Sequence, residues 1–245
     1  MHQPIDIKGA GSIVILTGAG ISVESGLPSF RGADGLWEGW RLEDVATPEA
    51  FERQPATVQR FYDERRQALL EPTIAPNPAH KALAELEDRW PGEVLVVTQN
   101  IDDLHERAGT RSLIHMHGEL LRARCTACAA VHPCRYDLQP DHECDRCGGA
   151  NSLRPHVVWF GEMPLALEEI YAALAQCDLF LSIGTSGQVY PAAGFVAEVR
   201  RHGRAHTIEL NLEPSAVNSD FAEHRQGPAS QTVPGLVEEL LAAQD

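Results

Sequence analysis

Residues 12–22 read SIVILTGAGIS, and this stretch decides the fold class. Its first six residues form an aliphatic, mostly β-branched run, which predicts a strand over 12–17 that is buried on both faces. The small residues that follow allow backbone N–H groups to approach a ligand phosphate closely. A buried strand that runs into a small-residue loop is typical of α/β proteins that bind nucleotides.

Three further runs of the same kind occur along the chain. Each ends in turn or polar residues, and they predict strands over 93–98, 178–183 and 206–210. Helical patterns lie between these strands and near the end of the chain, over 81–90, 165–176 and 234–243. Because strands and helices alternate and the strands are apolar on both faces, we expect an α/β fold with a doubly wound parallel sheet.

Two segments interrupt this alternation. Residues 36–75 include a helical pattern at 49–70, and residues 121–154 carry cysteines, glycines and prolines with little periodicity. We interpret the two segments as one small module, partly helical, that is inserted into the sheet domain. The sheet domain then comprises residues 1–35, 76–120 and 155–245.

The composition excludes several classes of partner. Of 245 residues, 20 are Lys or Arg and 35 are Asp or Glu, so the net charge is −15, which repels phosphate backbones and anionic membrane surfaces. No apolar run reaches the roughly 18 residues of a membrane span, and no export signal is visible. We therefore expect a cytoplasmic protein with neither nucleic acid nor a membrane as partner. In that compartment six cysteines indicate metal ligands or core residues rather than disulfides.

Polar and small residues follow all four expected strands. The loop from Gly18 comes after the first, and TQNID at 98–102, IGTSG at 183–187 and ELNLE at 209–213 come after the others. Ligands of open α/β sheets bind at the carboxyl ends of strands, so four such loops indicate one extended ligand. The GxGxxG spacing of ordinary dehydrogenases is absent. Polar residues at these positions could also serve only as helix caps.

Two histidines, His115 and His117, stand two residues apart in the sequence IHMHGEL. In an extended segment they share one face. A histidine beside a sugar hydroxyl can act as a general base, because its ordinary pKa lies near neutral pH. Metal ligation by the pair is the alternative, but no third ligand is evident nearby in the sequence.

Four cysteines provide the most specific local signal. Cys125 and Cys128 are followed, after a gap of fifteen residues, by Cys144 and Cys147. Two such pairs supply the four thiolates of a tetrahedral Zn²⁺ site. Because the protein fills all four positions, this zinc would stabilise the small module and perform no chemistry. We expect one structural zinc ion.

Taken together, these motifs and the loop PSFRG at 28–32 resemble the sirtuin family of NAD-dependent protein deacylases. The resemblance spans nearly the whole chain, with the motifs in the family's order. It implies a Rossmann-like domain, a small zinc module, an active site in the cleft between them, and NAD as a consumed cosubstrate.

The resemblance also assigns NAD contacts. It implies that Phe30 covers the nicotinamide side and that Arg31 lies near the phosphates. Further contacts are implied for Gly18, Ala19, Gly20, Ile21, Ser22, Glu24, Pro28 and Trp37, for Gln99, Asn100, Ile101 and Asp102, and for Gly184, Thr185, Ser186, Asn211, Leu212, Glu213 and Ala229.

The chemistry of the family implies a reaction. The carbonyl oxygen of an acyl-lysine attacks C1′ of the nicotinamide ribose, nicotinamide leaves, and the implied base His117 deprotonates a ribose hydroxyl that attacks the resulting imidate. The products are free lysine, nicotinamide and O-acyl-ADP-ribose. The implied partners are proteins with acylated lysines, whose peptide would bind as an added strand beside Val157, Trp159, Phe160, Gly161 and Glu162.

Two residues indicate which acyl groups the protein would remove. Tyr62 and Arg65 are three apart in an expected helix and project from one face, so together they could clamp a carboxylate. The pair resembles the Tyr and Arg of the sirtuin subgroup that removes succinyl and malonyl groups, and Ala46 resembles the small residue that leaves room for the acyl chain. This implies a desuccinylase and deacetylase. The alternative is a surface Arg65 paired with Glu64.

Two other functions fit parts of the sequence. An enzyme with the same NAD site could transfer ADP-ribose to a protein side chain. A non-enzymatic zinc-ribbon module could bind NAD only as a sensed ligand, but His117 and the Tyr62–Arg65 pair have no obvious use in it.

Overall fold

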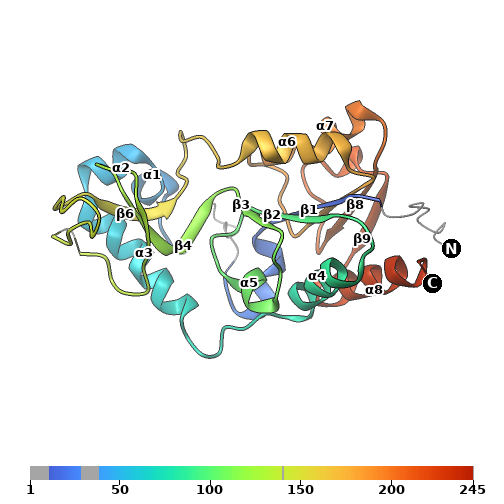
Figure 1. Ribbon diagram of the computed structural model, residues 1–245, viewed down its shortest axis with the longest axis horizontal. Coiled ribbons are helices and arrows are strands. Elements are labelled where there is room, and N and C mark those ends of the chain that lie inside the picture. The colour runs from blue at the N-terminus through green and yellow to red at the C-terminus, as the bar shows by residue number, and fades with distance from the viewer. Residues whose placement is uncertain (1–10, 29–38, 140, 245) are drawn as a thin grey trace.

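Six parallel strands form the central sheet, in the order β3-β2-β1-β7-β8-β9 (Figure 1). They are β1 (Ile13–Thr17), β2 (Val94–Thr98), β3 (Leu113–His115), β7 (Leu179–Ile183), β8 (His206–Asn211) and β9 (Glu223–Gln226). The structure, a computed structural model, describes residues 11–28, 39–139 and 141–244. The first strand lies inside the sheet and later strands are added on both sides of it, so the expected doubly wound parallel sheet is confirmed.

Helices cover both faces of this sheet. Ile13 and Ile15 of β1 belong to a core cluster with α4 (Pro78–Arg89) and α8 (Ala229–Ala242). Val14 and Leu16, which point to the opposite face, belong to a cluster with α6 (Leu167–Gln176) and α7 (Phe195–His202). Figure 1 shows α6 and α7 above the sheet and α4 and α8 below it. The four residues are at most 3% exposed, which explains why the strand is aliphatic throughout.

The four expected strands are all present, and each begins or ends within one residue of its expected range. Two strands of the central sheet, β3 and β9, were not predicted. Both lie at an edge of the sheet, and β9 reads EHRQ, with alternate residues exposed. A polar edge strand carries no apolar run, so the pattern that identifies buried strands does not detect it.

Two expected helices differ from the structure. The single helix expected over 49–70 is two helices, α2 (Pro48–Arg53) and α3 (Pro55–Leu69), because Pro55 cannot continue a preceding helix and instead occupies a first-turn position of α3. The helix expected over 234–243 begins earlier, at Ala229, with Pro234 inside it. Asn77 caps α4 as its sequence indicates, since its side chain accepts a hydrogen bond from Ala79 N.

A second, smaller group of elements lies beside the sheet, and we call it the small lobe. It consists of α1 (Leu42–Val45), α2, α3 and an antiparallel sheet with the order β5-β4-β6, whose strands are β4 (Gly118–Cys125), β5 (Val131–Pro133) and β6 (Leu153–Val157). Phe61 and Leu69 of α3 pack in one cluster with Leu120 and Val157 of the small sheet. Arg66, 1% exposed, donates to the carbonyl of Leu120 at 3.1 Å and so fixes α3 against β4.

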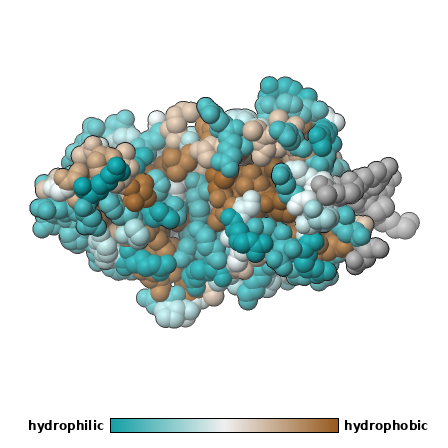
Figure 2. All heavy atoms as spheres, viewed as in Figure 1, coloured by the Kyte–Doolittle hydropathy of each residue, from teal (hydrophilic) through white to brown (hydrophobic). Residues whose placement is uncertain are grey.

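The remaining elements are short. They are α5 (Leu104–Ala108) and the 3₁₀ turns Ala19–Ile21, Val23–Ser25, Ala192–Gly194 and Asn218–Asp220. Figure 2 shows that hydrophilic residues cover most of the face in view, with hydrophobic residues gathered in its middle beside α6. Among the helices that the structure describes, none has both the length and the apolar character needed to cross a membrane.

Candidate active site

A cleft of about 970 Å³ lies at the carboxyl ends of β1, β2, β7 and β8 and extends to the small lobe. Its lining brings together most of the residues that the sequence analysis singled out. From the sheet side these are Gly18, Ala19, Gly20, Ser22, Pro28, Gln99, Asn100, Ile101, Asp102, His117, Gly184, Thr185, Ser186, Asn211 and Glu213. From the small lobe and the segment after β6 they are Ala46, Tyr62, Arg65, Val157, Trp159, Phe160, Gly161 and Glu162.

Two glycine loops meet backbone to backbone on the sheet side of the cleft. The N–H of Gly20 donates to the carbonyl of Gly184 at 2.9 Å. A Cβ on Gly20 would lie 2.6 Å from the Cα of Gly184, and one on Gly184, whose φ is +63°, would lie 2.5 Å from the nitrogen of Ile21. Only glycines permit this approach. The loops after β1 and β7 therefore form one continuous small-residue surface, which suits a bound phosphate.

Asn100 and Asp102 hold this loop from the β2 side. The Asn100 amide donates to the carbonyl of Gly18 and to Ser22 Oγ, both at 3.2 Å. Ser22 Oγ in turn donates to Asp102 Oδ2 at 3.0 Å. Burial raises the pKa of Asp102 to about 6, although hydrogen bonds from Leu104 N and Ser22 favour the carboxylate. A buried carboxyl whose pKa is raised by desolvation is characteristic of functional sites.

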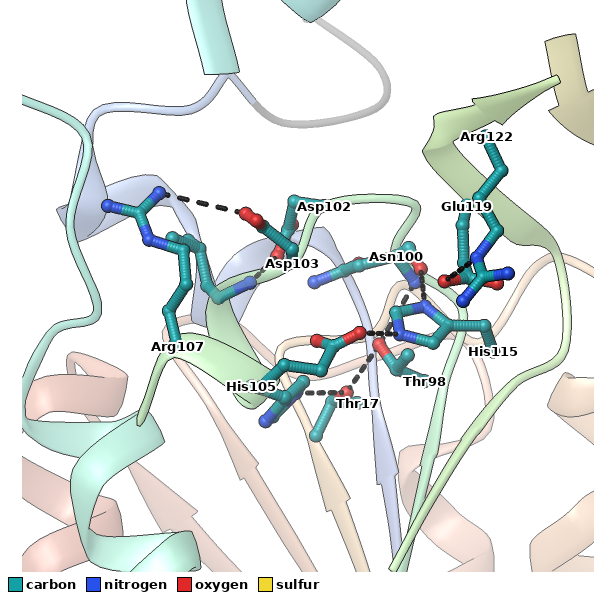
Figure 3. A network of polar contacts seen from close by, with 12 residues as sticks. Thr17, Thr98, Asn100, Asp102, Asp103, His105, Arg107, His115, Glu119 and Arg122 are labelled. Atoms are coloured by element: carbon teal, nitrogen blue, oxygen red, sulfur yellow. Dashed lines mark hydrogen bonds and ion pairs between the residues drawn. The ribbon is translucent and has the colours of Figure 1, made fainter. Parts of the chain in front are cut away.

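The backbone of Asn100 is fixed on both sides (Figure 3). Its N–H donates to Thr98 Oγ1 at 3.0 Å, and its carbonyl accepts from His115 Nδ1 at 3.1 Å. The other nitrogen of His115 lies 2.8 Å from a Glu106 carboxylate oxygen. Burial alone would lower the pKa of His115, but Glu106 raises it above its ordinary value. Glu106 lies in α5, and it is a carboxylate neighbour of His115 that the sequence analysis did not identify.

His117 is placed for proton transfer. Its Nδ1 lies 3.1 Å from the carbonyl oxygen of Gln99, so Nδ1 carries the proton and donates, and the lone pair is on Nε2. His115 and His117 thus bind two consecutive carbonyls, those of Asn100 and Gln99. Burial lowers the pKa of His117 below its ordinary value. A neutral imidazole with a free Nε2 at the edge of the cleft can accept a proton from a bound ligand.

Tyr62 and Arg65 lie on α3 and line the small-lobe end of the cleft together with Ala46. Tyr62 is fully buried, and Arg65 is half-buried, with Nη1 donating to the carbonyl of Phe61 at 2.7 Å. Ala46 is 3% exposed, and its carbonyl accepts from the N–H of Phe160 at 3.0 Å. Trp159 Nε1 donates to the phenol oxygen of Tyr62 at 3.0 Å, so α3 and the segment after β6 meet at one wall of the cleft, which includes Ala46, Tyr62, Arg65 and Trp159. Of the described residues that line the cleft, Arg65 alone is an arginine or lysine.

The four cysteines of the expected zinc site lie together in the small lobe. Their sulfur atoms all lie within 4.8 Å of one another. Cys125 and Cys147 have sulfurs 3.8 Å apart, and so do Cys128 and Cys144. Four sulfurs at about 2.3 Å from a tetrahedral zinc ion stand about 3.8 Å apart, so the cluster fits a structural Zn²⁺. His132 Nε2, 3.4 Å from Cys144 Sγ, adds a neighbour that the cysteine spacing did not indicate.

Some residues expected to contact NAD do not line this cleft. Ile21 is fully buried in the core beneath the loop, Leu212 is 63% exposed, and Ala229 packs against the core at the start of α8. Glu24 faces α8, where it accepts from the N–H and the hydroxyl of Ser230 at 2.9 and 2.6 Å. Phe30, Arg31 and Trp37 lie outside the described residues.

Two buried histidines beneath the cleft were not singled out from the sequence. His80 Nε2 lies 3.5 Å from Ser22 Oγ, and His105 Nε2 lies 3.1 Å from Thr17 Oγ1. Their rings are 5.0 Å apart at an angle of 62°. Burial lowers the pKa of His80 to about 4 and that of His105 well below its ordinary value. Both are isolated histidines in helical segments, so no spacing in the sequence marks them. Pro214, Ser215 and Ala216, which follow β8 outside any helix, also line the cleft and were not identified from the sequence.

Comparison with known proteins decides the family. The sequence profile of the Sir2 family matches residues 18–191, which contain both glycine loops, the Gln99–Asp102 segment, His117 and the four cysteines. The chain belongs to the Sir2 family. This assignment agrees with the sirtuin resemblance read from the motifs.

Relatives of this Sir2 protein resemble it over nearly their whole length. The NAD-dependent protein deacylase of Vibrio cholerae is 61% identical over 232 residues, which cover 95% of this chain and 94% of the relative. The NAD-dependent protein deacylase of Salmonella typhi is 59% identical over 229 residues, which cover 94% of this chain and 84% of the relative.

Solved Sir2 structures share the fold. A complex of a Sir2 homologue with NAD superposes with a TM-score of 0.86 at 39% identity, covering 96% of this chain and 91% of the other. A mutant Sir2 homologue with ADP-ribose bound gives a TM-score of 0.88 at 38% identity, covering 98% and 95%. The fold of this chain is therefore common to Sir2 homologues whose structures contain NAD or ADP-ribose.

Proposed function

We propose that this Sir2 protein is an NAD-dependent protein-lysine deacylase that removes succinyl and acetyl groups. The observation that carries the proposal is one continuous cleft, with glycine loops and His117 at the sheet side and the Tyr62–Arg65 pair at the other. Deacylase activity is supported by family membership and by relatives of 59–61% identity that carry that description. NAD is the cosubstrate, consumed with release of nicotinamide and O-acyl-ADP-ribose.

The chain's own residues perform distinct parts of this reaction. The loops around Gly20 and Gly184 offer backbone groups to the pyrophosphate, and the polar segment of Asn100 and Asp102 holds the nicotinamide ribose. His117, with its Nδ1 proton committed to Gln99, accepts the proton of a ribose hydroxyl at Nε2. Desolvation keeps this imidazole neutral at physiological pH, the form in which it is a base.

The acyl group is selected at the wall of the cleft formed by Ala46, Tyr62, Arg65 and Trp159, which we call the acyl wall. A succinyl chain ends in a carboxylate, which requires a cation and a hydrogen-bond donor once it leaves water. Arg65 supplies the cation and Tyr62 the phenol. Burial raises the pKa of Tyr62 above its ordinary value, so the phenol stays protonated and neutral and does not repel the carboxylate. An acetyl group needs neither partner, so it depends on this pair less.

Acylated-lysine proteins are the proposed partners. Phe160 and Gly161 on one side and Gln188 to Tyr190 on the other border the cleft, which suits a peptide held through its backbone. We place the reaction in the cytoplasm, where thiols stay reduced, since all six cysteines are free thiols and four of them converge as metal ligands.

The experiment that tests the proposal compares acyl groups. Purified protein is incubated with NAD and matched peptides bearing succinyl-, malonyl- or acetyl-lysine, and nicotinamide and free peptide are quantified. The Arg65→Met variant should lose about tenfold to a hundredfold in kcat/KM for succinyl-lysine, because a hydrogen bond to a charged group contributes about 1.5–3 kcal/mol, and much less for acetyl-lysine.

The matched control is Arg60→Met, which removes an exposed arginine from the same helix away from the cleft. It should leave the kcat/KM values for both peptides near those of the parent protein. Equal losses on succinyl- and acetyl-lysine in Arg65→Met would contradict the role of Arg65. No nicotinamide release with any acyl-lysine, or radiolabelled ADP-ribose attached to the acceptor protein, would contradict deacylation.

A further inference from the structure

Trp159 connects the acyl wall to a buried ion pair. It lies two residues after the end of β6 and is 3% exposed. One side of its ring packs against Phe51, with centroids 5.3 Å apart, and the guanidinium carbon of Arg154 lies 3.3 Å from its centroid. An arginine stacked on an indole in a desolvated setting is a favourable contact. Contacts with Phe51 and Arg154 therefore fix the position of the Trp159 ring.

The backbone of Trp159 is held by the same ion pair. Arg154 binds both carboxylate oxygens of Glu162, through Nη1 to Oε1 at 2.6 Å and through Nη2 to Oε2 at 3.0 Å. Glu162 Oε2 also accepts the N–H of Trp159 at 2.8 Å. The Glu162 carboxylate thus points back into the small lobe, although the residue borders the cleft. Ring and backbone of Trp159 are fixed by one bidentate pair.

The indole of Trp159 makes a directed contact with Tyr62. Nε1 donates to the phenol oxygen of Tyr62 at 3.0 Å. An indole nitrogen is a donor only, so in this pair the phenol oxygen accepts, and its own proton is directed to an acceptor other than Trp159. A hydroxyl that accepts one hydrogen bond becomes a better donor in another, because consecutive hydrogen bonds polarise each other.

We propose that Trp159 is a positioning residue for acyl selectivity: its hydrogen bond holds the Tyr62 phenol in the orientation that donates to the carboxylate of a dicarboxylic acyl group. This inference rests on the proposed function and deepens it. The Arg154–Glu162 pair, the Trp159 indole and the Tyr62 phenol form one chain of contacts that ends at the acyl wall. The succinyl or malonyl group is the substrate class that benefits from it, whereas acetyl offers no carboxylate to receive the proton.

The test is a double-mutant cycle on selectivity. The ratio of kcat/KM for succinyl-lysine to that for acetyl-lysine is measured in the parent protein, Trp159→Phe, Tyr62→Phe and the double variant. Any loss common to both peptides cancels in this ratio. Trp159→Phe should lower it about fivefold, and Tyr62→Phe about tenfold or more, as expected for a neutral partner and a direct donor to a charge. In the Tyr62→Phe background, the Trp159→Phe change should lower it no further.

The control variant separates the hydrogen bond from packing. Phe51→Leu alters the packing of the Trp159 ring and keeps the indole N–H, so the ratio should stay at the parent value. A ratio that falls as far in Phe51→Leu as in Trp159→Phe would overturn the inference, because packing alone would then explain the selectivity. So would an unchanged ratio in Trp159→Phe, or losses that multiply in the double variant.

A measurement without turnover distinguishes this inference from the proposed function. With ¹⁵N-labelled tryptophan the chain gives one indole signal for each of four residues, and the Trp159 signal is the one missing in Trp159→Phe. It should shift in Tyr62→Phe, because the proton loses its acceptor. An unshifted signal would overturn the hydrogen bond itself. A shifted signal in a protein that turns over no acyl-lysine peptide would refute the proposed function and, with it, the role in selectivity.

Discussion

The Nδ1 atom of His117 lies 3.1 Å from the carbonyl oxygen of Gln99, and this single contact decides which nitrogen of the imidazole can act as a base. Gln99 follows β2 directly, and its own N–H is bound to the carbonyl of Thr17 at 2.9 Å. The orientation of His117, which lines the cleft, is therefore set by the backbone of the central sheet, and Nε2 is left as the proton-accepting nitrogen.

The first prediction concerns the pH dependence of turnover. Burial lowers the pKa of His117 in the free protein below its ordinary value of 6.5, so kcat/KM should rise with pH along a limb with a midpoint below 6.5 and then level off. His117→Ala should lose about a hundredfold or more in kcat, the scale of general-base catalysis, and still bind NAD in calorimetry. A midpoint above 7, or retained turnover in the variant, would remove His117 from this role.

The second prediction links Asp102 to stability. Its folded-state pKa of about 6 is raised above the unfolded value of about 4, so between these pH values the folded protein holds a proton that the unfolded chain has lost. The free energy of unfolding therefore falls as pH rises through this window, by about 2–3 kcal/mol in total. In Asp102→Asn this pH-dependent decrease in the free energy of unfolding should disappear, because asparagine does not ionise.

Urea unfolding of the parent protein and of Asp102→Asn, from pH 4 to pH 8, checks this prediction. The variant should gain stability relative to the parent as pH rises above 4, reaching its full advantage above pH 6, while its turnover decreases. A stability difference that is the same at every pH would show that Asp102 does not carry the raised pKa. The pH 4 measurement is the reference point, since in the folded state both proteins are neutral at position 102 there and the effect of ionisation is smallest.

The third prediction tests the meeting of the glycine loops. In Gly184→Ala the new Cβ would lie 2.5 Å from the nitrogen of Ile21, so the loops must separate, and both the affinity for NAD and the free energy of unfolding should fall, the latter by about 1–3 kcal/mol. Titration calorimetry and urea unfolding measure the two effects.

Gly203→Ala is the matched control for this variant. Gly203 has a φ of +67°, close to the +63° of Gly184, and nothing lies within 4 Å of its Cβ position after α7. It should lose a similar backbone contribution to stability, about 1–2 kcal/mol, with NAD affinity unchanged. If both variants bind NAD equally well, the close approach of the loops has no part in the cofactor site.

The fourth prediction concerns zinc. The purified protein should contain one zinc ion per chain, and Cys125→Ser should lose it and unfold at a lower temperature, because structural zinc binding is coupled to folding. Cys177→Ala, a change at a buried cysteine outside the cluster, should keep the full zinc content. Metal analysis and thermal unfolding give the result; a well-folded parent protein without zinc would contradict it.

Much of the central architecture could be predicted from the sequence, because the buried strands carry a strong signal. Aliphatic runs such as Ile13–Thr17 reveal strands that are covered on both faces, and the polar loops after them mark the edge where the cleft opens. The zinc ligands were also accessible, since Cys125 and Cys128 show their common role through spacing alone.

What the sequence could not reveal depends on contacts between distant residues. The Trp159–Tyr62 hydrogen bond joins positions 97 apart, and the His80–Ser22 contact joins positions 58 apart. No local pattern encodes either. The edge strand β9 was missed because it is polar, and an apolar pattern detects only strands that are buried. The break between α2 and α3 was missed because the apolar pattern of the helix continues across the proline that interrupts it.

The position of β1 in the middle of the sheet has a consequence for how this protein is made. On the ribosome, Ile13–Thr17 emerges before either of its two neighbours, because β2 and β7 follow only at Val94 and Leu179. Until then the nascent chain exposes an unpaired aliphatic segment, the type of surface that recruits chaperones. The glycine loop beyond it meets Gly184 only after β7 has been synthesised, so the dinucleotide cannot assist the early stages of folding.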